Sequence, residues 1–334
     1  ALYDRCSKAF KSICASYAPV MESFSIDEVF LDMTGTGQIY PDPVATACEI
    51  KDRIYRELGF TVNVGISTNK LLAKMASDFE KPNKVHTLYP EEVPQKMWPL
   101  PVRDLLFLGK ASEKKLVQNG IRTIGDLARA NEKEIQMLLG EKAGHQLYLS
   151  ANGIDDSPVK AQREEAKGIS VETTFDEDIV SYEQIFPILL SQCDIVAARM
   201  RREGKKCNCV AVSFRTLEFK NKSHQRKLDN PTDVTNEIYQ NVRQLFQESW
   251  SGQPLRLIGV ALTGLTEDDF IQMSLFEDPK KREQQKKLDE AMDNIRKKFG
   301  NDKISRASTM NVSGRIARKA KAQMENGRKK NDEQ

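Results

Sequence analysis

The fold is set by the stretch SIDEVFLD, residues 25–32, which places two adjacent acids between short apolar runs. The apolar residues on both sides, Phe24 and Ile26 among them, predict two short strands that meet in a tight hairpin. In a regular strand, Asp27 and Glu28 would point to opposite faces. At a hairpin tip or bulge both carboxylates can converge on one point. Two such carboxylates suit Mg²⁺, which takes its other ligands from water and phosphate, whereas the alternative is an ordinary solvated turn.

Residues 61–83 form a second informative region. Alternating apolar residues at 61–66 predict a strand, and Ser67 or Thr68 is expected to cap a helix that ends at Pro82. Four apolar residues of this helix fall in one sector and predict a packed face: Leu71, Leu72, Met75 and Phe79. Three lysines fall on the opposite side: Lys70, Lys74 and Lys81. A lysine stripe is usually a solvated face, but opposite the acidic hairpin it would offset the charge of a triphosphate held between them.

Three segments carry a family resemblance: FSIDEVFLD at 24–32, VGISTNKLLAKMASDFEKPN at 64–83 and GIRTIGDL at 120–127. In this order and spacing they resemble the Y-family (translesion) DNA polymerases, most closely the polymerase IV branch and next the UmuC-type branch. The resemblance implies an α+β multidomain fold with a truncated polymerase palm, a small all-helical helix-hairpin-helix thumb and a βαββαβ little-finger domain. It implies error-prone, template-directed translesion DNA synthesis without proofreading, as part of DNA damage tolerance.

The resemblance also implies roles for individual residues. Asp27 and Glu28 are expected to bind the two catalytic Mg²⁺ ions, with Glu28 as the catalytic acid. Lys81 matches the lysine that contacts the triphosphate of the incoming dNTP, and Lys74 is a second candidate for that contact. Ser25 matches the position at which polymerases of this family approach the primer end of the primer-template DNA.

The start of the sequence departs from the family pattern. The family begins with a strand that carries its first metal-binding aspartate, followed by a fingers segment, and neither precedes the hairpin here. An amphipathic helix is predicted instead, with an apolar face made by Leu2, Cys6, Phe10, Ile13 and Tyr17. We therefore expect residues 1–92 to be a truncated palm. Because two-metal catalysis needs ligands on both ions, the chain by itself is expected to have negligible polymerase activity.

Residues 93–160 predict short helices with glycine turns, the expected thumb, and residues 161–166 a linker. Gly109 and Lys110 are expected to contact DNA phosphate from the first helix-hairpin-helix turn. The family has Gly-x-Gly in this turn, but Phe107 stands at the first glycine position, and its presence is expected to weaken one phosphate contact. The alternative for this segment is a plain helical bundle.

Residues 167–268 predict the order βαββαβ, in which the helices cover one face of a four-stranded sheet and leave the other free. Basic residues on the central hairpin of this little finger are expected to contact the DNA backbone: Arg215, Lys222, Arg226 and Lys227. The alternative is a charged hairpin that protects an edge strand.

Residues 269–312 contain a short peptide and a predicted helix. The peptide QMSLF resembles the clamp-binding peptide of bacterial polymerases, and Gln272, Leu275 and Phe276 are expected to dock in a groove of the replication sliding clamp. The alternative is that the two apolar residues pin a turn. The helix at 279–299 has a predicted apolar face made by Leu288, Met292, Ile295 and Phe299. Residues 313–334 predict a basic, disordered tail.

Composition limits the remaining classes. The 334 residues carry 51 basic and 48 acidic side chains, so DNA affinity must come from local patches. No signal peptide or apolar run of membrane-spanning length is present in the sequence, so we expect a cytoplasmic monomer without membrane contact. Two other classes stay open: a non-catalytic DNA- and clamp-binding module, and a metal-dependent nuclease that uses Asp27 and Glu28.

Overall fold

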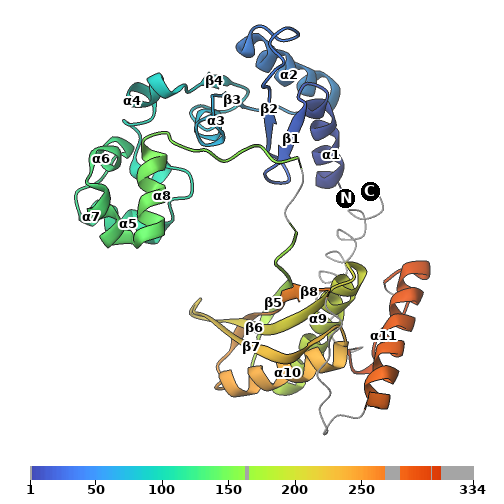
Figure 1. Cartoon of the computed structure of the whole chain (residues 1–334). Helices are drawn as coiled ribbons and strands as arrows, with labels where there is room; N and C mark the ends of the chain where they lie inside the picture. The colour runs from blue at the N-terminus through green and yellow to red at the C-terminus, as the bar shows by residue number, and fades with distance from the viewer. Residues whose placement is uncertain (1, 162–164, 268–278, 302, 310–334) are drawn as a thin grey trace. The chain divides into compact units, whose positions relative to one another are not determined.

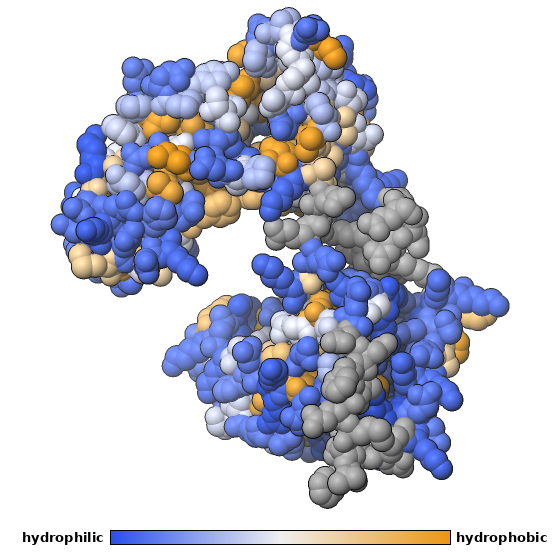
Figure 2. Space-filling view, viewed as in Figure 1, coloured by the Kyte–Doolittle hydropathy of each residue, from blue (hydrophilic) through white to orange (hydrophobic). Residues whose placement is uncertain are grey.

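The computed structural model describes residues 2–161, 165–267, 279–301 and 303–309. They fall into two compact units, Ala1–Glu164 and Glu165–Gln334 (Figure 1). The visible face of each unit is mostly hydrophilic, with hydrophobic side chains gathered in separate small patches (Figure 2). Across the described ranges, none of the helices is long and apolar enough to cross a membrane.

The first unit begins with the palm elements. These are α1 (Leu2–Ala15), β1 (Val20–Ser23), β2 (Val29–Asp32), α2 (Pro43–Leu58), β3 (Val64–Ile66), α3 (Lys70–Ser77) and β4 (Val85–Thr87). Strands β1 and β2 pair antiparallel, and β3 and β4 pair parallel. The apolar faces of α1 and α2 meet around Phe10, Ile13 and Ile54, and the β1–β2 hairpin packs against them through Leu31. The acidic hairpin therefore rests on a two-helix core.

The first strand of the hairpin ends earlier than the sequence predicts. Phe24 and Ile26 lie beyond β1, in the tip, so their expected strand positions were wrong. The backbone N–H groups of Phe24 and Ser25 both donate to the carbonyl of Glu28, at 3.0 and 3.2 Å. Because two donors share one acceptor, the regular ladder cannot continue through the tip.

Helix α3 also differs from its predicted bounds. Its N-cap is Asn69, whose Oδ1 accepts a 2.8 Å hydrogen bond from the Leu72 N–H, so the expected Ser67 or Thr68 cap was wrong. The helix ends at Ser77, and Lys81 therefore lies in the segment that follows it. Strand β3 packs very closely on this helix, because a Cβ added at Gly65 would stand 1.9 Å from the Ala73 carbonyl oxygen. Only a residue without a side chain permits this approach.

The thumb elements follow in the same unit. They are η1 (Pro90–Glu92), α4 (Val93–Lys96), η2 (Val102–Asp104), α5 (Lys110–Gln118), α6 (Ile124–Arg129), α7 (Glu132–Leu139) and α8 (Glu141–Ala151). Their buried side chains, such as Leu116 and Leu127, form one hydrophobic cluster with Leu72 and Met75 of α3. Asn69 also donates to the Gly153 carbonyl at 2.9 Å. The lysine-bearing helix is thus fixed to the thumb as well as to the palm strands.

The second unit has the predicted βαββαβ order, which confirms the little-finger fold. Its elements are β5 (Gly168–Ile179), α9 (Tyr182–Arg202), β6 (Lys206–Thr216), β7 (Asn221–Thr232), α10 (Thr235–Ser249) and β8 (Leu255–Thr266). The antiparallel sheet has the order β5-β8-β6-β7 (Figure 1). Val212, Phe214 and Val260 of the sheet pack with Ile185 of α9 and Phe246 of α10 in one core. The two helices therefore cover the same face of the sheet.

A proline lies close to the boundary between β7 and α10. Strand β7 continues through Pro231 to Thr232, which pairs with Cys207 across an irregular stretch in which the extra residues belong to β7. Proline is tolerated here because β7 is an edge strand and Pro231 lies in the irregular stretch, between the paired positions.

Helix α11 (Pro279–Phe299) and η3 (Ala307–Thr309) complete the second unit. Of the predicted apolar face of α11, only Met292 is buried, whereas Leu288, Ile295 and Phe299 are exposed, so that prediction was wrong. The buried side of the helix carries Asp289 and Arg296 instead. These charges find partners on α9, which the periodicity of apolar residues cannot reveal.

Candidate active site and DNA-binding surfaces

The tip of the β1–β2 hairpin brings its two carboxylates to one point. The Ser25 hydroxyl donates to Asp27 Oδ1 at 2.6 Å and lies 3.3 Å from Glu28 Oε2. Asp27 is exposed and Glu28 is half-buried, so both remain accessible from solvent. Because the Ser25 hydroxyl is within hydrogen-bonding distance of both carboxylates, the side chains of Asp27 and Glu28 do not point in the opposite directions of a regular strand.

Helix α1 holds this tip in place. Lys11 Nζ donates to the Ser25 carbonyl at 2.7 Å, and the Ser7 hydroxyl donates to the Ile26 carbonyl. Sequence reasoning missed both residues. Their spacing of four residues places them on one face of a helix, which was the available signal, but their partners lie far away in the chain.

A chain of ion pairs connects the hairpin to α3. Lys74 Nζ lies 2.9 Å from Glu28 Oε1 and 2.6 Å from Asp78 Oδ2, and Lys81 Nζ lies 2.6 Å from Asp78 Oδ1. Lys74 therefore contacts the acidic tip directly, whereas Lys81 is linked to it through Asp78. The third lysine of the stripe, Lys70, pairs with Glu22 at 2.7 Å instead.

These ion pairs keep the lysine beside the hairpin charged. Burial lowers the pKa of Lys74, but hydrogen bonds to Asp78 and Glu28 outweigh it and raise the pKa overall. Burial raises the pKa of Asp78, but the ammonium groups of Lys74 and Lys81 outweigh it and lower the pKa overall. At neutral pH the tip thus faces a permanent positive charge.

The donor set at the tip fits Mg²⁺. Among the residues that the structure describes, no three or more His, Cys, Asp or Glu side chains are grouped so that they could hold a metal. Mg²⁺ does not require such a cage, because it usually binds one or two carboxylates and keeps water and substrate phosphate as further ligands. Asp27 and Glu28 can supply that pair.

The first thumb turn presents the N-terminus of a helix. Gly109 is the N-cap of α5 and provides no capping side chain, and Lys110 is the first residue of the helix. Phe107, two residues earlier, has a φ of 67°. The centroid of its ring lies 6.3 Å from that of Phe24 at the acidic hairpin, in an edge arrangement. This contact joins the thumb turn to the hairpin tip.

The four basic residues predicted on the little finger lie on two faces of the sheet. Lys222 lies opposite Phe214, and Arg226 lies opposite Val210. Phe214 and Val210 are buried under the helices, so Lys222 and Arg226 are on the helix-covered face. Arg215 and Lys227 occupy the alternate positions of their strands and therefore lie on the open face. Arg226 also donates to Gln244 and Glu248 of α10. The expected single cluster is therefore divided.

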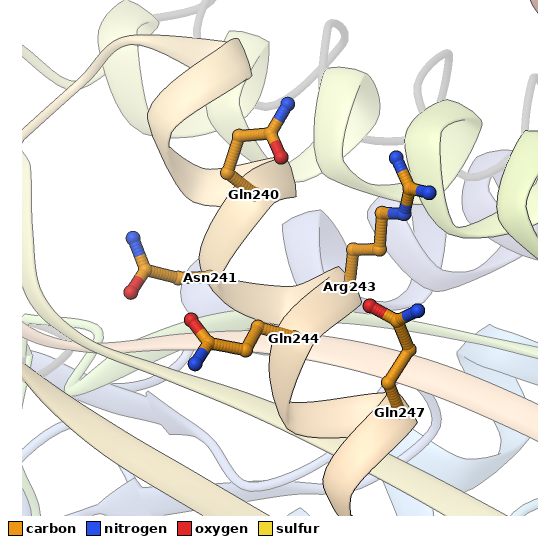
Figure 3. A pocket seen from close by; sticks show the side chains of 5 residues that line it. All are labelled: Gln240, Asn241, Arg243, Gln244 and Gln247. Carbon is orange, nitrogen blue, oxygen red and sulfur yellow. The ribbon is translucent and has the colours of Figure 1, made fainter.

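The open face is lined mainly by small and polar side chains. Gly259 of β8 leaves room for Ser213 Oγ to donate to Glu172 Oε1 across it, at 3.1 Å. A depression of about 280 Å³ lies beside this contact and extends to Arg215 and Asn221. A second depression, of about 220 Å³, lies along α10 and is lined by Gln240, Asn241, Arg243, Gln244 and Gln247 (Figure 3). The second depression contains no carboxylate and so offers no Mg²⁺ ligand of the usual kind.

The clamp-binding residues predicted from the sequence lie outside the described residues. This applies to Gln272, Leu275 and Phe276, and also to the basic tail at 313–334.

Comparison with known proteins covers both units. Residues 1–78 match the impB/mucB/samB family, residues 166–275 match the C-terminal domain of that family, and residues 103–155 match a thumb domain described from DNA polymerase-iota. The chain is 41% identical to DNA polymerase IV of Clostridium acetobutylicum, over 91% of this chain and 76% of the relative. It is 36% identical to DNA polymerase IV 2 of Bacillus subtilis, over 95% and 78% respectively. A solved chimaera of the Y-family DNA polymerases Dbh and Dpo4 has the same fold, with a TM-score of 0.69 and 22% identity over 80% of this chain and 77% of that one.

The acidic hairpin, the helix-hairpin-helix thumb and the βαββαβ domain together have the architecture of a Y-family DNA polymerase. The relatives narrow this class further. The chain belongs to the DNA polymerase IV family, and its function is that of a DNA-directed DNA polymerase in translesion synthesis.

Proposed function

We propose that the hairpin tip at Asp27 and Glu28 binds Mg²⁺ and the 3′ end of a primer for nucleotidyl transfer from a dNTP. The convergence of both carboxylates on Ser25, beside the charged Lys74, is the observation that supports this placement. Mg²⁺ bound there would lower the pKa of the primer 3′-hydroxyl and stabilise the charge of the triphosphate.

The residues around the tip have separate tasks in this proposal. Asp27 is the exposed ligand, and Ser25 orients its carboxylate. Lys74 adds fixed positive charge beside Glu28, and Lys81 is exposed enough to leave Asp78 and contact the triphosphate. Lys11 supports the tip from α1 and is a positioning residue.

Primer extension tests this function. Two-metal catalysis places ligands on ions about 4 Å apart, and the family pattern puts a further carboxylate on a strand before the hairpin. We expect the 334-residue polypeptide alone to give negligible extension of a labelled primer-template with Mg²⁺ and dNTPs. A fusion that adds, before Ala1, the strand and the fingers segment of the family pattern should extend the primer.

The same gel separates the alternative functions. Shortened labelled products would support a metal-dependent nuclease. DNA binding by the fusion without extension or cleavage would support a non-catalytic binding module. Extension by the 334-residue polypeptide at the rate of the fusion would contradict the expected need for the added strand.

We propose that the thumb turn at Gly109 and Lys110 and the open face of the little finger contact the DNA backbone. Arg215 and Lys227 are the basic residues placed on that open face. Their replacement by alanine should lower DNA affinity and reduce the slope of log K against log salt by about 2, because about 0.9 is lost with each phosphate contact. Fluorescence anisotropy over a range of salt concentrations measures both quantities.

The control for this prediction is the double variant with Lys222→Ala and Arg226→Ala. It removes the same charge from the other face, where Arg226 is already paired with Glu248, and should change the slope less. Equal slopes for both variants and the unmodified chain would exclude the open face as the contact surface.

The proposal extends to partners and compartment. Gln272, Leu275 and Phe276 would dock on the replication sliding clamp, in the manner of a short peptide with apolar anchors. The chain would act as a monomer in the cytoplasm.

A further inference from the structure

Phe107 occupies a turn position that its side chain disfavours. The Leu108 N–H donates to the Leu105 carbonyl at 3.1 Å, which closes a four-residue turn with Phe107 at its third position. The φ of 67° at this position is one that glycine or asparagine adopts readily. For a bulky residue it is a true outlier and costs free energy.

Packing within the protein does not account for this phenyl group. Leu105 is buried, and Leu106 and Leu108 pack against the thumb core. Phe107 is 78% exposed, so of these four consecutive apolar residues it is the one that faces solvent. A strained, exposed aromatic residue adds little to folding, and such strain usually persists at sites of function.

The surroundings of the ring indicate what it contacts. On one side it approaches Phe24, which directly precedes Ser25 of the catalytic tip. Two residues further along the chain, Gly109 and Lys110 begin helix α5. The ring thus has a residue of the acidic tip beside it in space and a helix N-terminus suited to phosphate close to it in sequence.

We propose that the Phe107 ring packs against the deoxyribose of the primer strand close to its 3′ end and is a positioning residue for the primer. A deoxyribose offers an apolar surface next to a phosphate, which suits a phenyl ring that lies three residues before Lys110 in the chain. The ring then supports the primer strand while Lys110 pairs with its backbone. This inference rests on the proposed placement of the primer end at Asp27 and Glu28.

The variant Phe107→Asn separates this role from a structural one, because it removes the ring without restoring the Gly-x-Gly turn of the family pattern. Asparagine adopts a positive φ more readily than phenylalanine, so the melting temperature of the 334-residue chain should be equal or higher. Affinity for a primer-template duplex should fall about tenfold, equivalent to about 1.4 kcal/mol. The salt slope should stay unchanged, because no charged contact is removed.

Met137→Ala is the matched control. Met137 is 79% exposed on α7 of the same thumb, and its removal should leave DNA affinity unchanged. Equal affinity of Phe107→Asn and the unmodified chain would overturn the inference and leave the proposed function intact. A loss of affinity with a reduced salt slope would also overturn it, since the loss would then belong to the phosphate contact. An unmodified chain that binds no DNA would overturn both.

Discussion

Asp27→Asn should reduce nucleotide incorporation by the active fusion about a thousandfold, equivalent to roughly 4 kcal/mol of transition-state stabilisation. The substitution keeps the shape of the side chain and an oxygen that can accept from the Ser25 hydroxyl, but it removes the negative charge that a metal ligand supplies. Because Asp27 is exposed at the tip, the fold and the affinity for DNA should change little. Single-nucleotide incorporation with a labelled primer measures the rate, and anisotropy measures binding.

Asp32→Asn is the matched control on the same hairpin. Hydrogen bonds from Thr34 lower the pKa of the Asp32 carboxyl group, so it is also negatively charged at neutral pH. It lies at the far end of β2, away from the tip. The control should keep activity within about twofold, as a surface substitution does. Equal loss in both variants would mean that hairpin stability, rather than metal binding, limits activity.

The elements that the sequence predicts well are those with a strong period of apolar residues. The little finger is the clearest case, because alternation in β6 and the stripe of α9 each define a buried face without knowledge of the partner. The convergence of Asp27 and Glu28 also follows from local pattern, since two acids between apolar runs indicate a hairpin tip.

The features that the sequence did not reveal depend on partners distant in the chain. Lys74 is placed beside the acidic tip by packing of α3 on β3 and the thumb core, and helical spacing alone could not distinguish it from Lys70 or Lys81. The basic hairpin of the little finger divides between two faces because its register fixes which residues of β7 oppose the buried residues of β6. The amino-acid composition of the hairpin does not determine how β6 and β7 are paired.

The docking of α11 is the plainest example, because charged rather than apolar residues hold it. Its Asp289 is 2% exposed and accepts from the backbone N–H of Thr235, at 2.7 Å, and from Arg306, at 2.6 Å. The N-cap residue of helix α10 is Val234, whose side chain makes no capping hydrogen bond. Asp289 therefore caps α10 from a neighbouring helix, where its charge also suits the helix dipole.

Asp289→Ala should lower the free energy of unfolding of the second unit by about 3–5 kcal/mol, the cost of leaving buried charges without their partner. Arg201 Nη1, 3.4 Å from Asp289, and the Arg306 guanidinium would lose that carboxylate. The first turn of α10 would lose its cap. Urea unfolding can be monitored by the hydrogen exchange of peptides from β6 and α10. Because both elements belong to the second unit, the measurement reports on this unit alone.

Glu290→Ala is the matched control for this change. It removes the same charge from the next residue of α11, whose side chain is exposed, and should alter stability by no more than about 0.5 kcal/mol. Asp289→Asn separates the two contributions, because the amide oxygen can still accept from the Thr235 N–H but carries no charge for the arginines. We expect this variant to keep slow amide hydrogen exchange in the first turn of α10. Its free energy of unfolding should fall by most of the amount lost in Asp289→Ala. If Asp289→Ala matched Glu290→Ala in both measurements, the buried ion pairs would not be what holds α11 on the domain.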